Sequence, residues 1–243
     1  MEINVRKIVI AGLLGAFTIV LGLTPLGLIP VPTPALHATT LHIPVILAGI
    51  LEGPLVGGMV GLIFGLISFF RATSPLFRDP LIAILPRICI GVFAFYAYTL
   101  VKTKFVHPAV SAAVGITIGH TIFKATQLLQ EKISAGYCGW LGIFQVLVQH
   151  PGRTIPLSAL LGLGGAILTY WLLRKAGAPA AFSALIGTLT NTVGVLSLAV
   201  IGGYLPAGAA ISVGILHGLP EILVAIIVVI SVEKSLSRIS RKG

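Results

Sequence analysis

The feature that most constrains this chain is a series of long apolar runs, which leave little room for a water-soluble core. They occupy about residues 8–29, 36–52, 54–71, 80–102, 107–127, 154–174, 180–202 and 209–232. A membrane-spanning helix needs about 20 consecutive apolar residues, so each run is a candidate span. Only 9% of the 243 residues are charged, whereas soluble domains have about 25%. The sequence therefore predicts an all-α, polytopic integral membrane helix bundle.

The distribution of Lys and Arg predicts how the chain is oriented. The first run lacks a cleavage site and is too long for a signal-peptide core, so we expect a retained span. With the N-terminus inside, ten of the sixteen Lys and Arg residues are cytoplasmic, five are outside, and Arg87 lies within a span. Cytoplasmic loops carry an excess of these residues. We therefore expect a multi-pass protein of the cell membrane with both termini cytoplasmic.

One segment does not follow the simple pattern of apolar spans. Residues 128–153 mix polar and apolar side chains, which is typical of an interfacial helix or of a re-entrant loop. The sequence leaves open whether 103–178 crosses the membrane twice or is partly re-entrant.

Small residues recur at helical spacing in three of the runs. In two runs they predict close packing between helices: Gly53, Gly57, Gly61 and Gly65 in one, and Ser111, Gly115 and Gly119 in the other. In the first run, Ala11 pairs with Gly15 and Gly12 pairs with Ala16 at the same spacing. Because this face allows close backbone contact, we predict that it docks a partner protein.

Polar side chains inside membrane spans are costly and are therefore candidate functional residues. We predict a ligand site towards the outer side, under the loop 30–38, formed by His42, Ser68, Arg71, Asn191, His217 and Glu221. His217 and Glu221 are four residues apart, on one helix face, with Pro220 between them. They form either part of this site or a structural pair. Arg87 either snorkels, pairs with a carbonyl, or takes part in the site.

Several kinds of chemistry lack their usual motifs here. The chain has no G-x-x-x-x-G-K-[ST] phosphate loop, no H-E-x-x-H and no G-x-S-x-G. Any ATP-derived energy would have to come from a partner. Cys89 and Cys138 are far apart and belong to no CxxC motif, so we expect no metal and no cofactor. The few Lys and Arg residues are explained as signals that orient the chain in the membrane, so we expect no nucleic acid as a partner.

Four stretches, taken in their order along the chain, resemble a known family. They are LHIPVILAGILEGPLVGGMVGLIFGLISFFRATSP, LPRICIG, IGTLTNTVGVL and HGLPEILVAIIVVISVEKSL. Together they resemble the substrate-binding S component of energy-coupling factor (ECF) vitamin transporters. The resemblance implies a membrane subunit, not an enzyme, that captures a vitamin or related micronutrient from outside. Its implied partners are a transmembrane coupling subunit and two cytoplasmic ATPases.

The resemblance covers about residues 8–102 and 180–236, and it implies a six-helix core. Residues 103–178 then look like an insertion of about two helices within a single transmembrane domain, 1–243. The family's A-x-x-x-A coupling motif falls on Ala11–Gly15 or on Gly12–Ala16. His217 stands where the family commonly has Asn before GLPE.

The substrate follows less directly from the sequence. Arg71 and Arg78 lie near the outer end of the third run, and a guanidinium fork suits a carboxylate. We therefore expect an anionic vitamin, with pantothenate the best guess, unless both arginines only anchor the chain at the headgroups. Two other functions remain as alternatives, namely an intramembrane enzyme using His217 and Glu221, or an autonomous secondary transporter.

Overall fold

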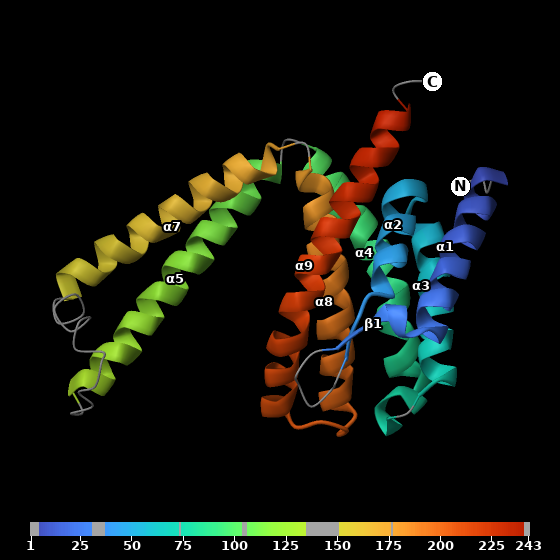
Figure 1. Cartoon of the computed structure of the whole chain (residues 1–243). Helices are drawn as coiled ribbons and strands as arrows, with labels where there is room; N and C mark the ends of the chain where they lie inside the picture. Colours follow the sequence, from blue (N-terminus) through green and yellow to red (C-terminus); the bar gives the residue numbers. More distant parts are fainter. Residues whose placement is uncertain are drawn as a thin grey trace. The chain divides into compact units, whose positions relative to one another are not determined.

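The computed structural model describes residues 5–30, 37–72, 74–103, 106–134, 151–175 and 177–240. Over these residues the chain forms eight α-helices and one short hairpin (Figure 1). The helices are α1 (Val5–Leu23), α2 (His42–Glu52), α3 (Pro54–Phe70), α4 (Pro80–Lys102), α5 (Val106–Ser134), α7 (Pro151–Leu173), α8 (Ala178–Ile201) and α9 (Ala207–Ser240). The short elements are η1 (Pro25–Gly27), β1 (Leu28–Pro30), β2 (His37–Thr39) and η2 (Pro75–Arg78). The predicted all-α bundle is confirmed.

The chain divides into two compact units. The first unit comprises Met1–Lys102 and Pro179–Gly243, and the second comprises Thr103–Ala178. The first unit contains α1 to α4, α8 and α9, and the second contains α5 and α7. Whether the two units act as one transmembrane domain stays a prediction.

The helices have the length and composition of membrane spans. Among the described residues, four stretches are long and apolar enough to cross a bilayer: Pro80–Lys102, Val106–Lys124, Ala178–Ile201 and Ala207–Leu236. Four shorter apolar helices accompany them: Lys7–Leu23, His42–Glu52, Pro54–Phe70 and Ser158–Leu173. Large apolar side chains such as Leu13, Phe70 and Ile201 remain exposed on the surface, as expected where lipid is the solvent.

Helix α2 begins six residues later than the apolar run that predicted it. Residues His37–Thr39 form β2, which pairs antiparallel with β1, so that Leu28 lies opposite Thr39. Pro44 favours the late start, because proline lacks an N–H and disturbs a helix least in its first turn. A helix beginning at residue 36 would have placed Pro44 in its interior. The hairpin replaces both the end of the first predicted run and the start of the second.

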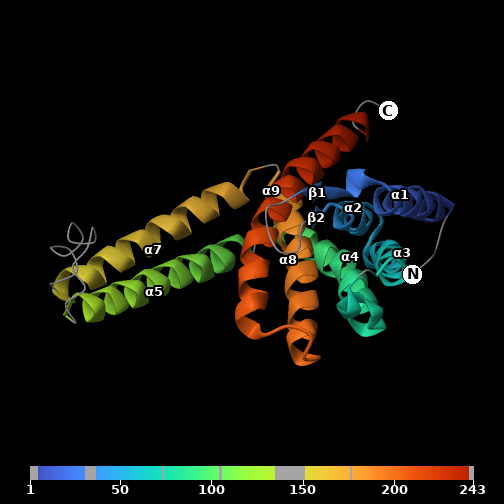
Figure 2. The same cartoon turned by 60° about the horizontal axis from the view of Figure 1, so that its bottom comes forward.

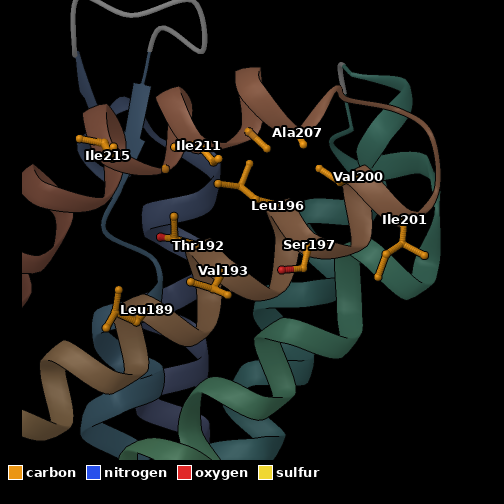
Figure 3. Close-up of a pocket in the computed structure, with 12 residues that line it drawn as sticks. Leu189, Thr192, Val193, Leu196, Ser197, Val200, Ile201, Ala207, Ile211 and Ile215 are labelled. Atoms are coloured by element: carbon orange, nitrogen blue, oxygen red, sulfur yellow. The ribbon is translucent and has the colours of Figure 1, made fainter. Parts of the chain in front are cut away.

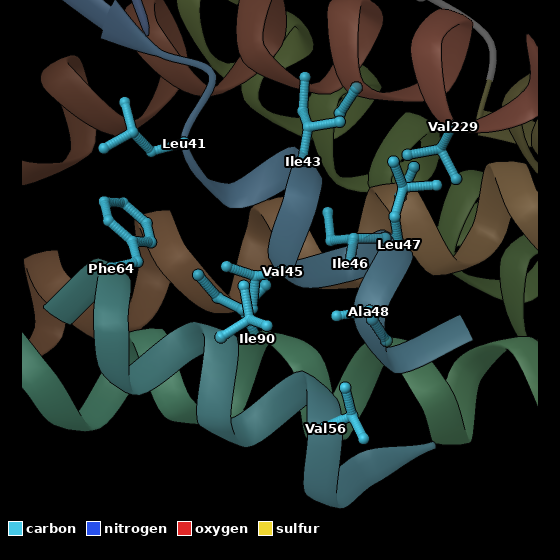
Figure 4. Packing of buried hydrophobic residues seen from close by; sticks show 14 of the residues in the cluster. Leu41, Ile43, Val45, Ile46, Leu47, Ala48, Val56, Phe64, Ile90 and Val229 are labelled. Carbon is cyan, nitrogen blue, oxygen red and sulfur yellow. The ribbon is translucent and has the colours of Figure 1, made fainter. Parts of the chain in front are cut away.

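Helix α2 forms the centre of the first unit. All residues from His42 to Gly49 are buried, and the apolar ones pack against Val56 of α3, Ile90 of α4 and Val229 of α9 (Figure 4). Its eleven residues rise only about 16 Å, well short of the roughly 30 Å hydrocarbon core. The polar backbone beyond its ends must therefore be satisfied by neighbouring elements.

Glycines allow α3 and α4 to cross at close range. A Cβ on Gly57 would lie 2.9 Å from Gly91 Cα, and one on Gly65 would lie 2.8 Å from Ile84 Cα. Gly61 packs in the same way against the main-chain carbonyl of Arg87. The predicted close packing of this glycine face is confirmed for these three positions. Gly53 instead makes the reversal between α2 and α3 at a φ of 97°.

The second unit is a pair of helices packed through small residues. A Cβ on Gly115 of α5 would lie 2.7 Å from Ala166 Cβ of α7, and Gly119 lies close to Gly162. The small-residue stripe predicted in this run thus packs within the chain. Residues 135–150, which make up most of the segment 128–153 discussed above, lie outside the described residues.

Successive helices of the first unit alternate in direction. The start of α1 and the end of α9 therefore lie at the same end of that unit (Figures 1 and 2). Arg71 and Arg78 follow α3 and lie at the opposite end. The hairpin strand β2 lies beside α9 (Figure 2). This contact brings the segment between α1 and α2 to the polar residues of α9.

Candidate functional site

Polar side chains from four helices lie within the first unit, where Glu221 is near Thr192 and Arg87, and Thr39 connects it to His42. We call them the polar cluster: His42 of α2, Arg87 of α4, Asn191 and Thr192 of α8, and Glu221 of α9. His42, Arg87, Asn191 and Glu221 are buried. Helices α4 and α8 are in close contact here, since a Cβ on Gly194 would lie 3.0 Å from Pro86 Cβ.

Glu221 joins α9 to the hairpin. Its Oε1 accepts a hydrogen bond from the main-chain N–H of Thr39 at 2.7 Å and a longer one from the Thr39 hydroxyl at 3.5 Å. The Thr192 hydroxyl lies beside the same carboxylate. Thr39 lies outside any helix, so its N–H needs such an acceptor when it is buried from water. One carboxylate oxygen therefore has a structural role.

Arg87 is held by a main-chain carbonyl of its own helix and by side chains of neighbouring elements. Pro86 has no N–H to donate to Ile82 O, and Arg87 Nη1 donates to this carbonyl at 2.6 Å. The guanidinium carbon lies 5.4 Å from the centre of the Phe64 ring and 5.0 Å from that of the Phe77 ring. The charge of Glu221 attracts it as well. The predicted carbonyl contact of Arg87 is confirmed.

Five buried polar atoms of the cluster make no well-aligned hydrogen bond, although the His42 ring lies beside the main chain of Thr39 and the Thr192 hydroxyl lies beside the Glu221 carboxylate. They are Nδ1 and Nε2 of His42, Nε of Arg87, Oδ1 of Asn191 and Oγ1 of Thr192. Most buried polar groups in proteins are satisfied, and leaving one unsatisfied costs about 1–3 kcal/mol. These atoms include donors and acceptors on three helices. The cluster is therefore complementary to a polar molecule that offers both.

The structure brings together some of the predicted site residues and places others nearby. His42, Asn191 and Glu221 belong to the polar cluster. Ser68 is half-buried on α3, one turn after Phe64, and His217 is buried on α9, one turn before Glu221.

Two other parts of the predicted site, Arg71 and the loop 30–38, do not belong to the polar cluster. Arg71 is exposed, and its guanidinium donates to the main-chain carbonyl of Gly22 at the end of α1. Residues 31–36 of the predicted covering loop lie outside the described residues, but Thr39, just after that loop, bonds Glu221. Arg87, which the predicted ligand set omits, belongs to the polar cluster. Its position directly after a mid-helix proline was the signal that could have placed it there.

An apolar groove adjoins the polar cluster at Thr192. It lies between α8 and α9, has a volume of about 500 Å³, and is lined mainly by aliphatic side chains such as Leu189, Leu196 and Ile211 (Figure 3). Its size is within the range of small-molecule pockets. Polar and apolar surfaces thus meet at one residue of α8. Within the described residues, no three His, Cys, Asp or Glu side chains are grouped to hold a metal ion.

The two small-residue pairs of α1 lie on different faces of the helix. Ala11 is buried, and a Cβ on Gly15 would lie 2.7 Å from Ile63 Cδ1 of α3. Gly12 and Ala16 are exposed, and a Cβ on Gly12 would meet no atom within 4 Å. The pair Gly12–Ala16 therefore forms a small-residue notch on the outward face of α1.

Comparison with known proteins identifies the family. No curated protein matches the sequence. A family model described as "ECF transporter, substrate-specific component" matches residues 6–233, a range that includes the second unit. The match covers nearly the whole chain and agrees with the apolar helices. The chain belongs to the family of substrate-specific components of ECF transporters, which are multi-pass membrane proteins.

Proposed function

We propose that this chain captures a vitamin or related micronutrient outside the cell and holds it at the polar cluster for ATP-driven uptake. The observation that carries this proposal is the set of five buried polar atoms, on three helices, that make no well-aligned hydrogen bond. Within a membrane protein, such groups commonly mark a substrate pathway. A bound solute would supply their partners, and the groove beyond Thr192 offers apolar surface to the rest of the molecule.

The chain depends on partners for energy. It has no phosphate loop, so ATP hydrolysis falls to two cytoplasmic ATPases, to which a transmembrane coupling subunit connects it. Gly12 and Ala16 on the outward face of α1 are the proposed docking residues, since a notch between large side chains lets another helix approach closely. In this proposal the chain lies in the cell membrane, and both of its termini are in the cytoplasm.

The chain does not act as an enzyme in this proposal. The enzymatic alternative uses His217 and Glu221 as acid and base, but Oε1 of Glu221 already accepts the N–H of Thr39. Solute binding, in contrast, needs only the polar groups that the cluster already contains. Pantothenate is our best guess for the solute because it combines a carboxylate with hydroxyl and amide donors.

Identification of the bound molecule tests the proposal. The full chain is purified from cells grown in rich medium, and co-purifying small molecules are identified by mass spectrometry. We expect one micronutrient at near-equimolar amount in the wild-type protein. Asn191→Leu, which keeps the side-chain size but removes the hydrogen-bonding groups, should lose it, whereas Ser212→Ala on the exposed face of α9 should retain it. Equal retention by Asn191→Leu would contradict the proposed site.

A further inference from the structure

Arg87 stands out because it is buried, unlike the other cations of the first unit whose side chains the structure describes. Only 4% of its surface is exposed, while Arg71 and Arg78 are exposed. A buried charge in a membrane protein is costly unless partners compensate for it. The groups that contact Arg87 therefore indicate its role.

The contacts of Arg87 fix the guanidinium but leave part of it unused. Nη1 donates to Ile82 O at 2.6 Å, and Phe64 and Phe77 flank the group. Nε remains buried without a partner. An Nε–H beside an Nη–H forms the fork that binds a carboxylate through two parallel hydrogen bonds. The fork is held in place before any ligand arrives, which lowers the entropic cost of binding.

The surrounding groups restrict what else the ligand can carry. Oδ1 of Asn191 is an unpartnered acceptor, so it requires a donor from the ligand. Glu221 acts electrostatically on Arg87 and already offsets part of its charge, so the site can compensate no more than one further carboxylate. The site thus favours one carboxylate at Arg87 together with a hydroxyl or amide donor for Asn191.

We propose that Arg87 is the specificity-determining residue of this transporter subunit and that it binds the single carboxylate of a small solute bearing hydroxyl or amide donors. This inference rests on the proposed function and moves the anion-binding role from Arg71 to Arg87. Arg71 uses its guanidinium at the carbonyl of Gly22, where it joins the outer ends of α1 and α3.

Titration calorimetry with matched ligand pairs tests this assignment. The probes are pantothenate and pantothenol, biotin and its amide, and nicotinate and nicotinamide, which within each pair differ in the carboxylate. Neutral riboflavin and cationic thiamine complete the panel. The proteins are the purified full-length wild type, Arg87→Gln, Arg87→Lys, Arg71→Gln and Arg174→Gln. Arg174 is a matched control because its exposed guanidinium also packs on an aromatic ring, that of Tyr170 at 5.6 Å.

We expect the wild type to bind one acid at least about 30-fold more tightly than its neutral partner, the effect of a charge-assisted fork. Arg87→Gln should remove that preference while changing the affinity for the neutral partner less than about threefold, because the neutral partner offers the guanidinium no carboxylate. The variant also loses the bond to Ile82 O, so its melting temperature is measured as well. Arg87→Lys keeps the buried charge but not the fork. Its preference for the acid should lie between those of the wild type and Arg87→Gln. If Arg87→Gln fails to fold, Arg87→Lys takes its place in the test. Arg174→Gln should behave as wild type.

Three results would overturn the inference. They are a neutral or cationic vitamin as the tightest ligand, an acid preference retained in a folded Arg87 variant, and loss of the preference in Arg71→Gln instead. Failure of the proposed function looks different, because the wild type would then bind no member of the panel and carry no co-purifying micronutrient.

Discussion

Glu221 Oε1 accepts the main-chain N–H of Thr39 at 2.7 Å, although the two residues are 182 positions apart in the chain. This bond fastens the hairpin strand β2 onto the last helix, beside the unpartnered atoms of the polar cluster. A single carboxylate thus connects the segment between α1 and α2 to the proposed solute site.

Removing that carboxylate should destabilise the fold more than neutralising it. Glu221→Ala leaves the N–H of Thr39 buried without an acceptor and should cost about 1–3 kcal/mol. In Glu221→Gln the amide oxygen still accepts the bond, so its melting temperature should lie closer to that of the wild type. Thermal unfolding in detergent measures both. A melting temperature of Glu221→Ala equal to that of the wild type would show that the bond contributes nothing.

The crossing of α3 and α4 should depend on the position of each glycine. Gly57→Ala places a Cβ 2.8 Å from Gly49 Cα and 2.9 Å from Gly91 Cα, which should cost on the order of 1–3 kcal/mol through overpacking. Gly58→Ala is the matched control, because its nearest neighbour would be Ile88 Cγ2 at 3.7 Å. That substitution should be neutral or slightly stabilising in a helix. Equal melting temperatures of the two variants would contradict the close crossing.

Bulk on the outward face of α1 should block assembly but spare solute binding. Gly12→Leu combined with Ala16→Leu fills the notch, so the coupling subunit should no longer co-purify, while solute affinity stays within a few-fold. Ala109→Leu with Ala113→Leu makes a similar change on an exposed face of α5 and should leave assembly intact. Undiminished recovery of the coupling subunit with the α1 variant would remove these residues from the proposed interface.

Bulk on the inward face of α1 should act differently. Gly15→Leu would collide with Ile63 of α3, since even a Cβ would lie 2.7 Å from its Cδ1. We expect a lower melting temperature as well as poorer assembly. A stable protein that has lost only the coupling subunit would instead assign Ala11–Gly15 as the docking pair.

The helices could be predicted from the sequence because hydrophobicity alone decides which segments enter a bilayer. The hairpin could not, since the apolar run 36–52 continues through His37–Thr39, and only the placement of Pro44 argues against so early a helix start. Glycine spacing correctly predicted a closely packed face on α3, because residues four apart share a helix face, but it did not identify α4 as the neighbour.

The site was harder to predict because it depends on which way each side chain points. Residues Arg71 and Arg87 are equally basic in sequence, yet one is exposed at a helix end and the other is buried beside a carbonyl that Pro86 leaves free. The contact between Thr39 and Glu221 joins opposite ends of the chain, and no local pattern reports it. Likewise, only the packing of α1 on α3 distinguishes Gly12–Ala16 from Ala11–Gly15.

Uptake by reconstituted vesicles tests the central claim most directly. Proteoliposomes are prepared with this chain alone or together with its coupling subunit and two ATPases, and they are supplied with the micronutrient identified by mass spectrometry, in radiolabelled form. The account predicts that the chain alone binds the solute at near-equimolar amount without accumulating it. The complete assembly should accumulate it only with ATP on the side of the ATPases. Uphill accumulation by the chain alone, or no ATP-dependent uptake by the complete assembly, would contradict the account.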